Sequence, residues 1–422
     1  MLFAQPGTPR ASRRSLIGRL LGFGVSAAVG RPGLATIAPH LFGQWSFGPL
    51  SPDWQPLEVA TGDTLLVKAR VAGSPVEAVL DSGSGASIID VSLARALGMA
   101  DGERRTISGL GGKAAVRLIH DFEVQLGHRT RRLPFAVVAD LGALSAAFGR
   151  RINMLLGADM FIDNCIALDF GHRRFALMPT GSFPGGADWT PVALGHGAKQ
   201  ELHVSASIGG LSAVPLMIDL GSSAALMLSS AYVDAHDLTR GRATSTAALG
   251  GVEGVATVDV FTTPKLTIGG LSAENIPTLG NRNWLSTSTV GNIGLPLIDQ
   301  FDAIFDVTAG FVWLRPPASG HRLPMLKDRS GLGLAASPTG LDVVHVAANS
   351  PAGKDGWIPG NRIVAVNGFP IDALYTHGAR WRWRFMPSGT VIKLKDRPVM
   401  TVSSDLRIIT KSLAHGPHQS HA

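Results

Sequence analysis

The chain has 422 residues, a formal net charge of +7, 45% hydrophobic residues and 16% charged residues. This composition supplies a sizeable core and excludes a wholly disordered chain, and the length allows two or three domains. Residues 1–31 contain five arginines and no acidic residue, and residues 321–422 are also basic. The positive charge therefore lies at the two ends, and the part between them is mildly acidic. We therefore expect no nucleic-acid partner for the central part.

The N-terminus has the pattern of a targeting segment. Ser12-Arg13-Arg14 precedes a weakly apolar run, Leu20 to Val29. Paired arginines before such a run resemble a bacterial twin-arginine export signal, which predicts a signal and linker over residues 1–40 and a periplasmic or cell-envelope location in a bacterium. Arg19 interrupts the run and no clear cleavage site follows, so membrane association through an uncleaved N-terminus stays open.

The first predicted domain, residues 55–180, begins with strands. Residues 65–71 and 76–80 flank Ala72-Gly73-Ser74-Pro75, which predicts a β-hairpin. The second strand ends at the turn Asp81-Ser82-Gly83-Ser84, and a short helix is expected over Val91 to Leu97 with Asp90 as its cap. A glycine-rich segment and more strands follow.

The same order returns 138 residues later in the second predicted domain, residues 190–318. Strands 202–208 and 214–218 lead to Asp219-Leu220-Gly221-Ser222, and a helix is expected over Ser229 to His236. Leucine- or isoleucine-glycine pairs and strand-end aspartates recur at nearly the same offset. A domain-sized period that occurs twice predicts two all-β lobes made by duplication. The recurring landmarks are Leu110-Gly111-Gly112 with Leu249-Gly250-Gly251, Leu156-Gly157 with Ile293-Gly294, and Asp169 with Asp306.

The two Asp turns predict a carboxylate pair, Asp81 and Asp219. Two adjacent carboxyls cannot both ionise easily, so they share a proton and titrate as one unit. The ionised member can take a proton from water while the protonated member polarises a peptide carbonyl, which requires no metal or cofactor. We expect Gly83 and Gly221 to permit sharp turns, and the hydroxyls of Ser84 and Ser222 to donate to the outer carboxylate oxygens.

At these residues the chain resembles the retropepsin-like aspartic proteases, whose active sites carry Asp-Thr/Ser-Gly-Ala/Ser on each lobe or subunit. The likeness spans roughly residues 58–316 and includes Leu155-Leu156-Gly157-Ala158-Asp159. It implies an endopeptidase that acts on polypeptides under glycine-rich flaps, and the absence of tyrosine from both candidate flaps favours a fused retropepsin dimer over a pepsin. The expected flap residues are Gly109, Leu110, Gly111 and Gly112 in the first lobe and Leu249, Gly250 and Gly251 in the second.

One residue departs from the family pattern. The second motif position carries a hydroxyl that helps to lock the two turns together; Ser82 fits, but Leu220 has no hydroxyl. The lock is therefore half made at best. A non-catalytic peptide-binding scaffold with a decayed dyad, and an enzyme that cuts only its own chain, remain alternatives to a general endopeptidase.

Residues 322–411 lie outside the repeat and resemble a PDZ domain. The resemblance rests on Ser330-Gly331-Leu332-Gly333-Leu334 and on the segment 357–368. It implies that Leu332, Gly333 and Leu334 form a loop that binds the C-terminus of a protein partner, beside a helix over residues 372–385. A module that only docks on the protease is the alternative, and residues 412–422 are expected to be a disordered tail.

The remaining reactive residue types give structural predictions. Cys165 is the only cysteine and lies in an apolar stretch, which indicates a buried structural thiol. Asp159, Asp169 and Asp306 are expected to be turn or structural residues. The histidines have no spacing typical of metal ligands, so we expect neither a metal nor a cofactor.

Overall fold

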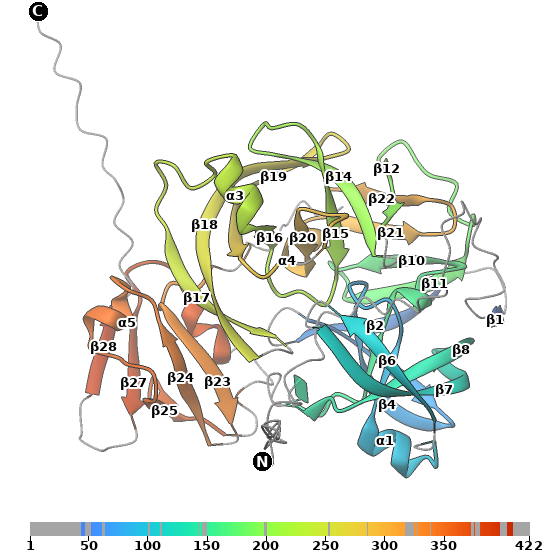
Figure 1. Ribbon diagram of the computed structural model, residues 1–422, viewed down its shortest axis with the longest axis horizontal. Helices are drawn as coiled ribbons and strands as arrows, with labels where there is room; N and C mark the ends of the chain where they lie inside the picture. Colours follow the sequence, from blue (N-terminus) through green and yellow to red (C-terminus); the bar gives the residue numbers. More distant parts are fainter. Residues whose placement is uncertain are drawn as a thin grey trace, which may run out of the picture.

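The computed structural model describes the chain between residues 44 and 407 with gaps. The described residues are 44–46, 52–60, 64–99, 102–109, 112–142, 144–145, 150–197, 201–251, 254–284, 286–316, 325, 327–337, 339–372, 375, 380–396 and 403–407. They form a mostly β structure with two lobes and a separate C-terminal module (Figure 1). The predicted export segment and the predicted tail lie outside the described residues. Within the described part, no helix is both long and apolar enough to cross a membrane.

Lobe 1 is a mixed sheet that curls back on itself. Its order is β3-β4-β9-β5-β8-β7-β6, and a further pairing of β3 with β7 closes the curl. The predicted hairpin is confirmed as β3 and β4, and the predicted helix as α1, Val91–Ala96, whose first turn is capped by the Asp90 carboxylate accepting from Ser92 N. The strands are β1 Gln44–Ser46, β2 Asp53–Ala60, β3 Thr64–Val71, β4 Ser74–Leu80, β5 Ile88–Asp90, β6 Glu103–Gly109, β7 Gly112–Leu126, β8 Arg129–Ala139 and β9 Met154–Leu156.

Lobe 2 repeats this topology strand for strand. Its order, β14-β15-β20-β16-β19-β18-β17, has the same parallel and antiparallel neighbours, and β14 also pairs with β18. The duplication expected from the sequence is therefore present in the fold. The elements are β13 Gly195–His196, β14 Leu202–Ile208, β15 Val214–Asp219, β16 Leu226–Ser229, α3 Ser230–Ala235, β17 Ser245–Gly251, β18 Gly254–Ile268, β19 Leu271–Asn281, β20 Gly291–Gly294 and α4 Leu295–Ile298.

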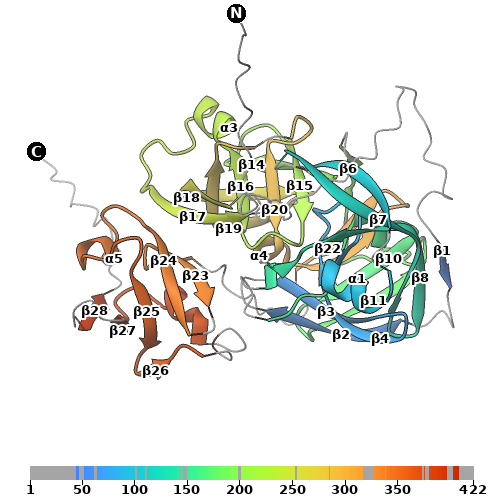
Figure 2. The same ribbon diagram turned by 60° about the horizontal axis from the view of Figure 1, so that its bottom comes forward.

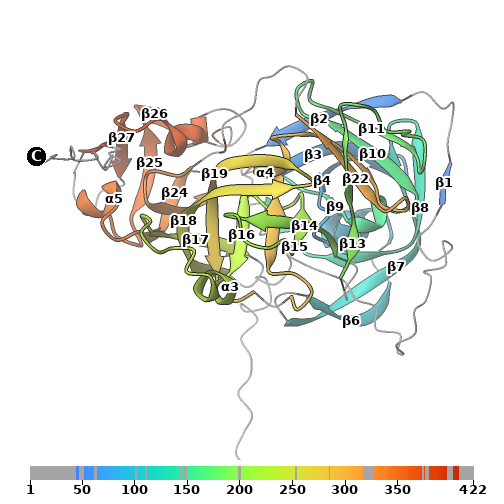
Figure 3. The same ribbon diagram turned by 90° about the horizontal axis from the view of Figure 1, so that it is seen from above.

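A shared antiparallel sheet joins the lobes. Its order is β12-β22-β21-β10-β11-β2, so three strands of the second half lie beside three strands of the first, and the halves meet where β21 pairs with β10 (Figure 1). Figure 3 shows β10, β11 and β22 of this sheet from above. Phe161 and Phe305 meet edge to face across this junction at a centroid distance of 5.7 Å. The remaining elements of this region are η3 Ala158–Met160, β10 Asn164–Asp169, β11 Arg174–Pro179, β12 Thr190–Ala193, β21 Asp302–Asp306 and β22 Phe311–Arg315.

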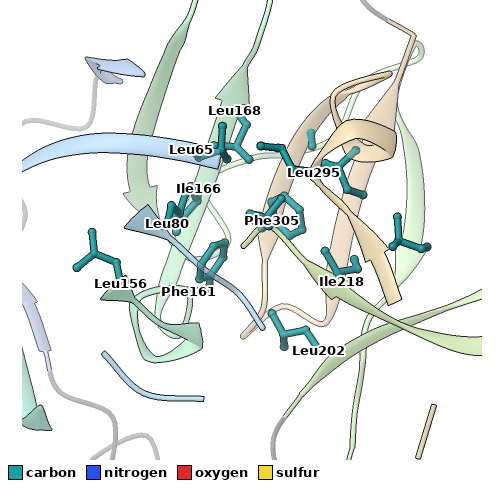
Figure 4. Close-up of a cluster of buried hydrophobic side chains, with 14 of the residues drawn as sticks. Leu65, Leu80, Leu156, Phe161, Ile166, Leu168, Leu202, Ile218, Leu295 and Phe305 are labelled. Atoms are coloured by element: carbon teal, nitrogen blue, oxygen red, sulfur yellow. The ribbon is translucent and has the colours of Figure 1, made fainter. Parts of the chain in front are cut away.

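The main hydrophobic core lies directly beneath the two Asp turns. Leu80 and Ile218, the residues before Asp81 and Asp219, are 3% and 1% exposed and belong to one cluster with residues of both lobes (Figure 4). Alternation along each strand sends these apolar side chains inward while the next residue reaches the opposite side. The core therefore fixes the end of each strand, and with it the position of each aspartate.

The C-terminal module has its own sheet and its own core, set apart from the lobes in Figure 2. The sheet order is β23-β24-β25-β27-β28, with β26 beside β25. The predicted helix over 372–385 is represented by the short 3-10 helix η5, in which Trp381 and Trp383 are buried and Trp383 Nε1 donates to Tyr375 at 2.6 Å. The elements are β23 Leu332–Ser337, β24 Gly340–Val346, α5 Pro351–Lys354, β25 Arg362–Val366, β26 Phe369–Pro370, η5 Arg380–Phe385, β27 Val391–Asp396 and β28 Ser403–Arg407.

Candidate active site

Each aspartate lies where a strand ends beside a parallel neighbour. Leu80, the last residue of β4, pairs with Leu156 of β9, and Asp81 N donates to Leu156 O at 2.9 Å. In lobe 2, Asp219 at the end of β15 pairs with Gly294 of β20. Both strands end there, and both chains turn at the aspartate. The duplicated topology thereby brings the two turns face to face.

The two carboxyls lie against each other's turns. A Cβ atom added to Gly83 would lie 2.6 Å from Asp219 Oδ1, and one added to Gly221 would lie 2.4 Å from Asp81 Oδ1. Real Cβ atoms do not approach other heavy atoms this closely, so only glycine fits. Both glycines lie in the turns, as expected, but neither is among the residues with positive φ, so it is the close approach of the opposite carboxyl that requires glycine.

The serines that follow the glycines do not act as predicted. Ser84 Oγ donates to Ala86 O at 2.8 Å, and Ser222 Oγ accepts from Ala224 N at 3.3 Å. Both hydroxyls thus stabilise their own turns. Backbone N–H groups contact the carboxylates instead, with Gly83 N on Asp81 Oδ1 at 3.0 Å and Gly221 N on Asp219 Oδ1 at 3.1 Å.

A single hydroxyl links the two turns. Ser82 Oγ donates to Ile218 O at 2.9 Å and accepts from Leu220 N at 3.1 Å, and the serine is 1% exposed. Leu220, its counterpart, is fully buried and packs in the main core. Ser82 therefore provides the one hydroxyl link between the two turns. At the equivalent position of lobe 2, the Leu220 side chain packs in the core instead.

Burial and mutual repulsion set the protonation of the pair. Burial first, and then the charge of Asp219, raise the pKa of Asp81 to about 7. Burial also raises the pKa of Asp219, although an amide from Asn292 and the backbone N–H groups of its own turn lower it. Two coupled carboxyls with raised pKa values retain one shared proton into the weakly acidic range, as general acid–base chemistry on a water molecule requires.

Asn292 is a site residue that the sequence reasoning missed. It is 3% exposed, and its Nδ2 donates to Asp219 Oδ2 at 2.8 Å. The repeat contains a signal that could have found it. The equivalent position in lobe 1 is Leu155, so a polar residue replaces an apolar one next to the second Asp turn.

Both predicted flaps are β-hairpins at the described positions. Strands β6 and β7 pair as far as Gly109 with Gly112, and β17 and β18 pair as far as Gly251 with Gly254. Of the predicted flap residues, Gly109, Gly112, Leu249, Gly250 and Gly251 lie in these strands, whereas Leu110 and Gly111 lie outside the described residues.

The predicted peptide loop of the C-terminal module is wrong in its secondary structure. Leu332, Gly333 and Leu334 are the first residues of strand β23, and the Leu332 side chain is buried in the module's core. One face of this strand meets the lobe 2 hairpin, because a Cβ on Gly333 would lie 2.6 Å from Ala248 Cβ.

Two polar contacts join the module to lobe 2. His345 Nε2 lies 3.0 Å from Thr246 Oγ1 of β17, and Lys327 Nζ donates to Thr262 Oγ1 of β18 at 2.8 Å. His345 is the cross-strand partner of Gly333, which contacts the same hairpin. The module is therefore docked on the strands that carry the second flap.

The other acidic and thiol groups have structural surroundings. Asp159 accepts from Ser87 N and Ser87 Oγ, which braces the chain beyond the first Asp turn, and burial raises its pKa to about 6. Burial raises the pKa of Cys165 to about 12, so the thiol is inert at neutral pH. Among the described residues no group of three or more His, Cys, Asp and Glu side chains could hold a metal.

Two matching lobes, a shared interlobe sheet and two opposed Asp turns define a mostly β, bilobal fold. Residues 67–160 match the family model described as aspartyl protease, and this segment contains the first Asp turn and the lobe 1 hairpin. Among solved structures, the chain is similar to the crystal structure of basic 7S globulin from soybean, with 9% identity and a TM-score of 0.43, over 64% of this chain and 97% of that chain. No curated protein matches the chain.

Proposed function

We propose that the chain is an aspartic endopeptidase that hydrolyses peptide bonds with a water activated by Asp81 and Asp219. The observation that carries the proposal is the reciprocal placement of the two carboxyls, each against the glycine of the opposite turn. Beside them, the Ser82 hydroxyl ties the turns together across the lobes. The aspartyl protease match over the first lobe supports the same chemistry.

The proposed reaction uses the shared proton of the pair. The ionised carboxyl accepts a proton as the water oxygen attacks the peptide carbonyl carbon, and the protonated carboxyl donates a hydrogen bond to the carbonyl oxygen. The resulting tetrahedral intermediate collapses when the carboxyl that took the water proton donates it to the leaving nitrogen, which breaks the C–N bond and restores the dyad. The substrate is an extended polypeptide lying between the dyad and the two hairpins.

The proposal is tested with an unfolded, fluorescence-quenched protein substrate. Asp81→Asn and Asp219→Asn should each lower kcat/KM by about 10²- to 10⁴-fold, because one carboxyl cannot serve both proton roles. Asp121→Asn is the matched control, since its carboxyl is 79% exposed and lies outside the site. Both dyad variants should keep the wild-type circular dichroism spectrum.

A scaffold with a decayed dyad is the competing function, and Leu220 is the residue that favours it. Wild-type protein that binds the unfolded substrate without cutting it at any pH from 3 to 8 would establish the scaffold. Cleavage confined to the protein's own chain would establish the self-processing alternative. Wild-type turnover that survives either dyad substitution would overturn the dyad as its source.

The finer assignments also remain our proposals. The hairpins contain neither Tyr232 nor Tyr375, which supports two fused retropepsin-like lobes. The sequence pattern of the C-terminal module supports a PDZ domain, while its contacts with β17 and β18 favour a docking role over capture of a partner's C-terminus. Equal cleavage of substrates with free and amidated C-termini would support docking alone.

Export to the bacterial envelope rests on the twin-arginine pattern alone. Fractionation of cells that express the full chain, with Arg13 and Arg14 both changed to Lys as the comparison, tests it. Loss of the envelope-associated protein in the double variant is the expected result, and membrane-bound full-length protein would indicate an uncleaved anchor.

A further inference from the structure

The two aspartates have different hydrogen-bond donors. Asn292 Nδ2 donates to Asp219 Oδ2 at 2.8 Å, while Gly221 N occupies the other oxygen, Oδ1, at 3.1 Å. Both oxygens of Asp219 therefore accept hydrogen bonds. The Oδ1 atom of Asn292 is buried and has no hydrogen-bond partner among the described residues.

Lobe 1 provides no matching amide. In the parallel pairs next to the dyad, Met217 faces Asn292 in lobe 2, whereas Val79 faces Leu155 in lobe 1. Met217 and Val79 each lie two residues before the aspartate of their own lobe. Their partners, Asn292 and Leu155, are therefore structurally equivalent. Leu155 is 1% exposed and packs in an apolar cluster of lobe 1, which leaves Asp81 without a side-chain amide at this position.

The Asn292 amide makes the two carboxyls unequal. A hydrogen bond donated to a carboxylate is stronger than one donated to a neutral carboxyl, so this contact favours the charged form of Asp219. Asp81, in contrast, is 6% exposed and lacks this donor, which favours its neutral form.

We propose that Asn292 is a positioning residue that holds Asp219 as the ionised member of the dyad and leaves the shared proton on Asp81. The catalytic consequence rests on the proposed function: Asp219 takes the proton from water, and Asp81 polarises the substrate carbonyl. The directions of the pKa shifts agree with this division of roles. The Asn292 amide lowers the pKa of Asp219, whereas burial and the charge of Asp219 raise the pKa of Asp81.

The decisive variant replaces Asn292 with the residue that lobe 1 carries, Asn292→Leu. A carboxylate that accepts two or three N–H bonds can have a pKa roughly two units below normal, so removing one donor should raise the lower apparent pKa of the dyad by about one unit. The acidic limb of the kcat/KM–pH profile should shift upward by the same amount. Asn292→Ala removes the donor without adding a titratable group and should shift the limb in the same direction.

Asn164→Leu is the matched control. Asn164 is also fully buried, but its amide donates to Met160 O and not to a carboxyl. It should lower the thermal unfolding midpoint without moving the acidic limb. Carbon-13 carboxyl titration of the dyad, assigned with Asp81→Asn and Asp219→Asn, supplies a second readout that requires no turnover.

The outcomes separate the two proposals. If the wild type cuts nothing but the lower titration step rises in Asn292→Leu, the proposed function fails and the role of Asn292 stands. If the wild type is active and neither variant at position 292 moves the limb or the titration, the inference is overturned. A lower step assigned to Asp81 instead of Asp219 also overturns it.

Discussion

Removal of the Ser82 hydroxyl should loosen the contact between the lobes. In Ser82→Ala, Ile218 O and Leu220 N both lose their cross-lobe partner in a buried setting. Each unsatisfied buried group costs about 1–3 kcal/mol, and the variant no longer has the cost of burying the serine hydroxyl. The net loss of stability should therefore be about 2–4 kcal/mol. At about 2–4 °C for each kcal/mol, the unfolding midpoint should fall by about 4–16 °C.

Calorimetry and kinetics on the same preparations measure this effect. Because the hydroxyl also sets the relative position of the two turns, kcat/KM should fall by about 10²-fold. Ser82→Thr keeps the hydroxyl and should restore most of both quantities. Ser84→Ala is the contrast, since Ser84 donates within its own turn and should cost only about 1 kcal/mol. A Ser82→Ala midpoint within 1 °C of wild type, with unchanged kcat/KM, would refute the reasoning.

Three further predictions follow from the site and the module. The folded pKa of Asp81 is about 7 against an ordinary 3.8, so folded protein holds a proton that unfolded protein releases, and stability should fall as pH rises from about 4 to about 7. Asp81 should contribute up to about 1.4 kcal/mol per pH unit to the slope measured by urea titrations, and a slope unchanged in Asp81→Asn would contradict this assignment. Gly221→Ala should reduce kcat/KM by at least about 10²-fold, because its Cβ would collide with the Asp81 carboxyl. Gly171→Ala is the control, since a Cβ there would have no neighbour closer than 3.7 Å. If Gly221→Ala has the same kcat/KM as this control, the turn can move to accept the methyl group. Gly333→Leu should push the module off Ala248 and speed amide hydrogen exchange in β17, and unchanged protection there would show that the module does not hold the hairpin.

The sequence allowed prediction of the parts that depend on local pattern. Strand alternation, the Asp turns and the constant offset between repeats predicted both lobes, the two short helices and the Asp90 cap, because these follow from backbone periodicity and short-range hydrogen bonds. Hydrogen-bond partners from distant parts of the chain are harder to predict. The Ser84 and Ser222 hydroxyls stand where serine can reach the carboxylates, but each one contacts a backbone group of its own turn.

Contacts between distant segments could not be inferred from one sequence. Nothing in the segment around Gly333 indicates that Ala248 would lie against it, since that contact depends on how the module docks on lobe 2. The Asn292 amide does not stand out in the sequence, because β20 otherwise consists of glycine and isoleucine and has the pattern of a core strand. Only the difference from Leu155, the equivalent residue of the first repeat, marks it.

Covalent fusion of the two halves allows the copies of a position to diverge. In a symmetric homodimer both subunits carry the same residue at every equivalent position, so any change in the site is made twice. Here Ser82 corresponds to Leu220, and Leu155 corresponds to Asn292. One half can therefore retain the hydroxyl that joins the turns while the other supplies an amide beside its carboxyl, an inequality that two identical subunits could not encode.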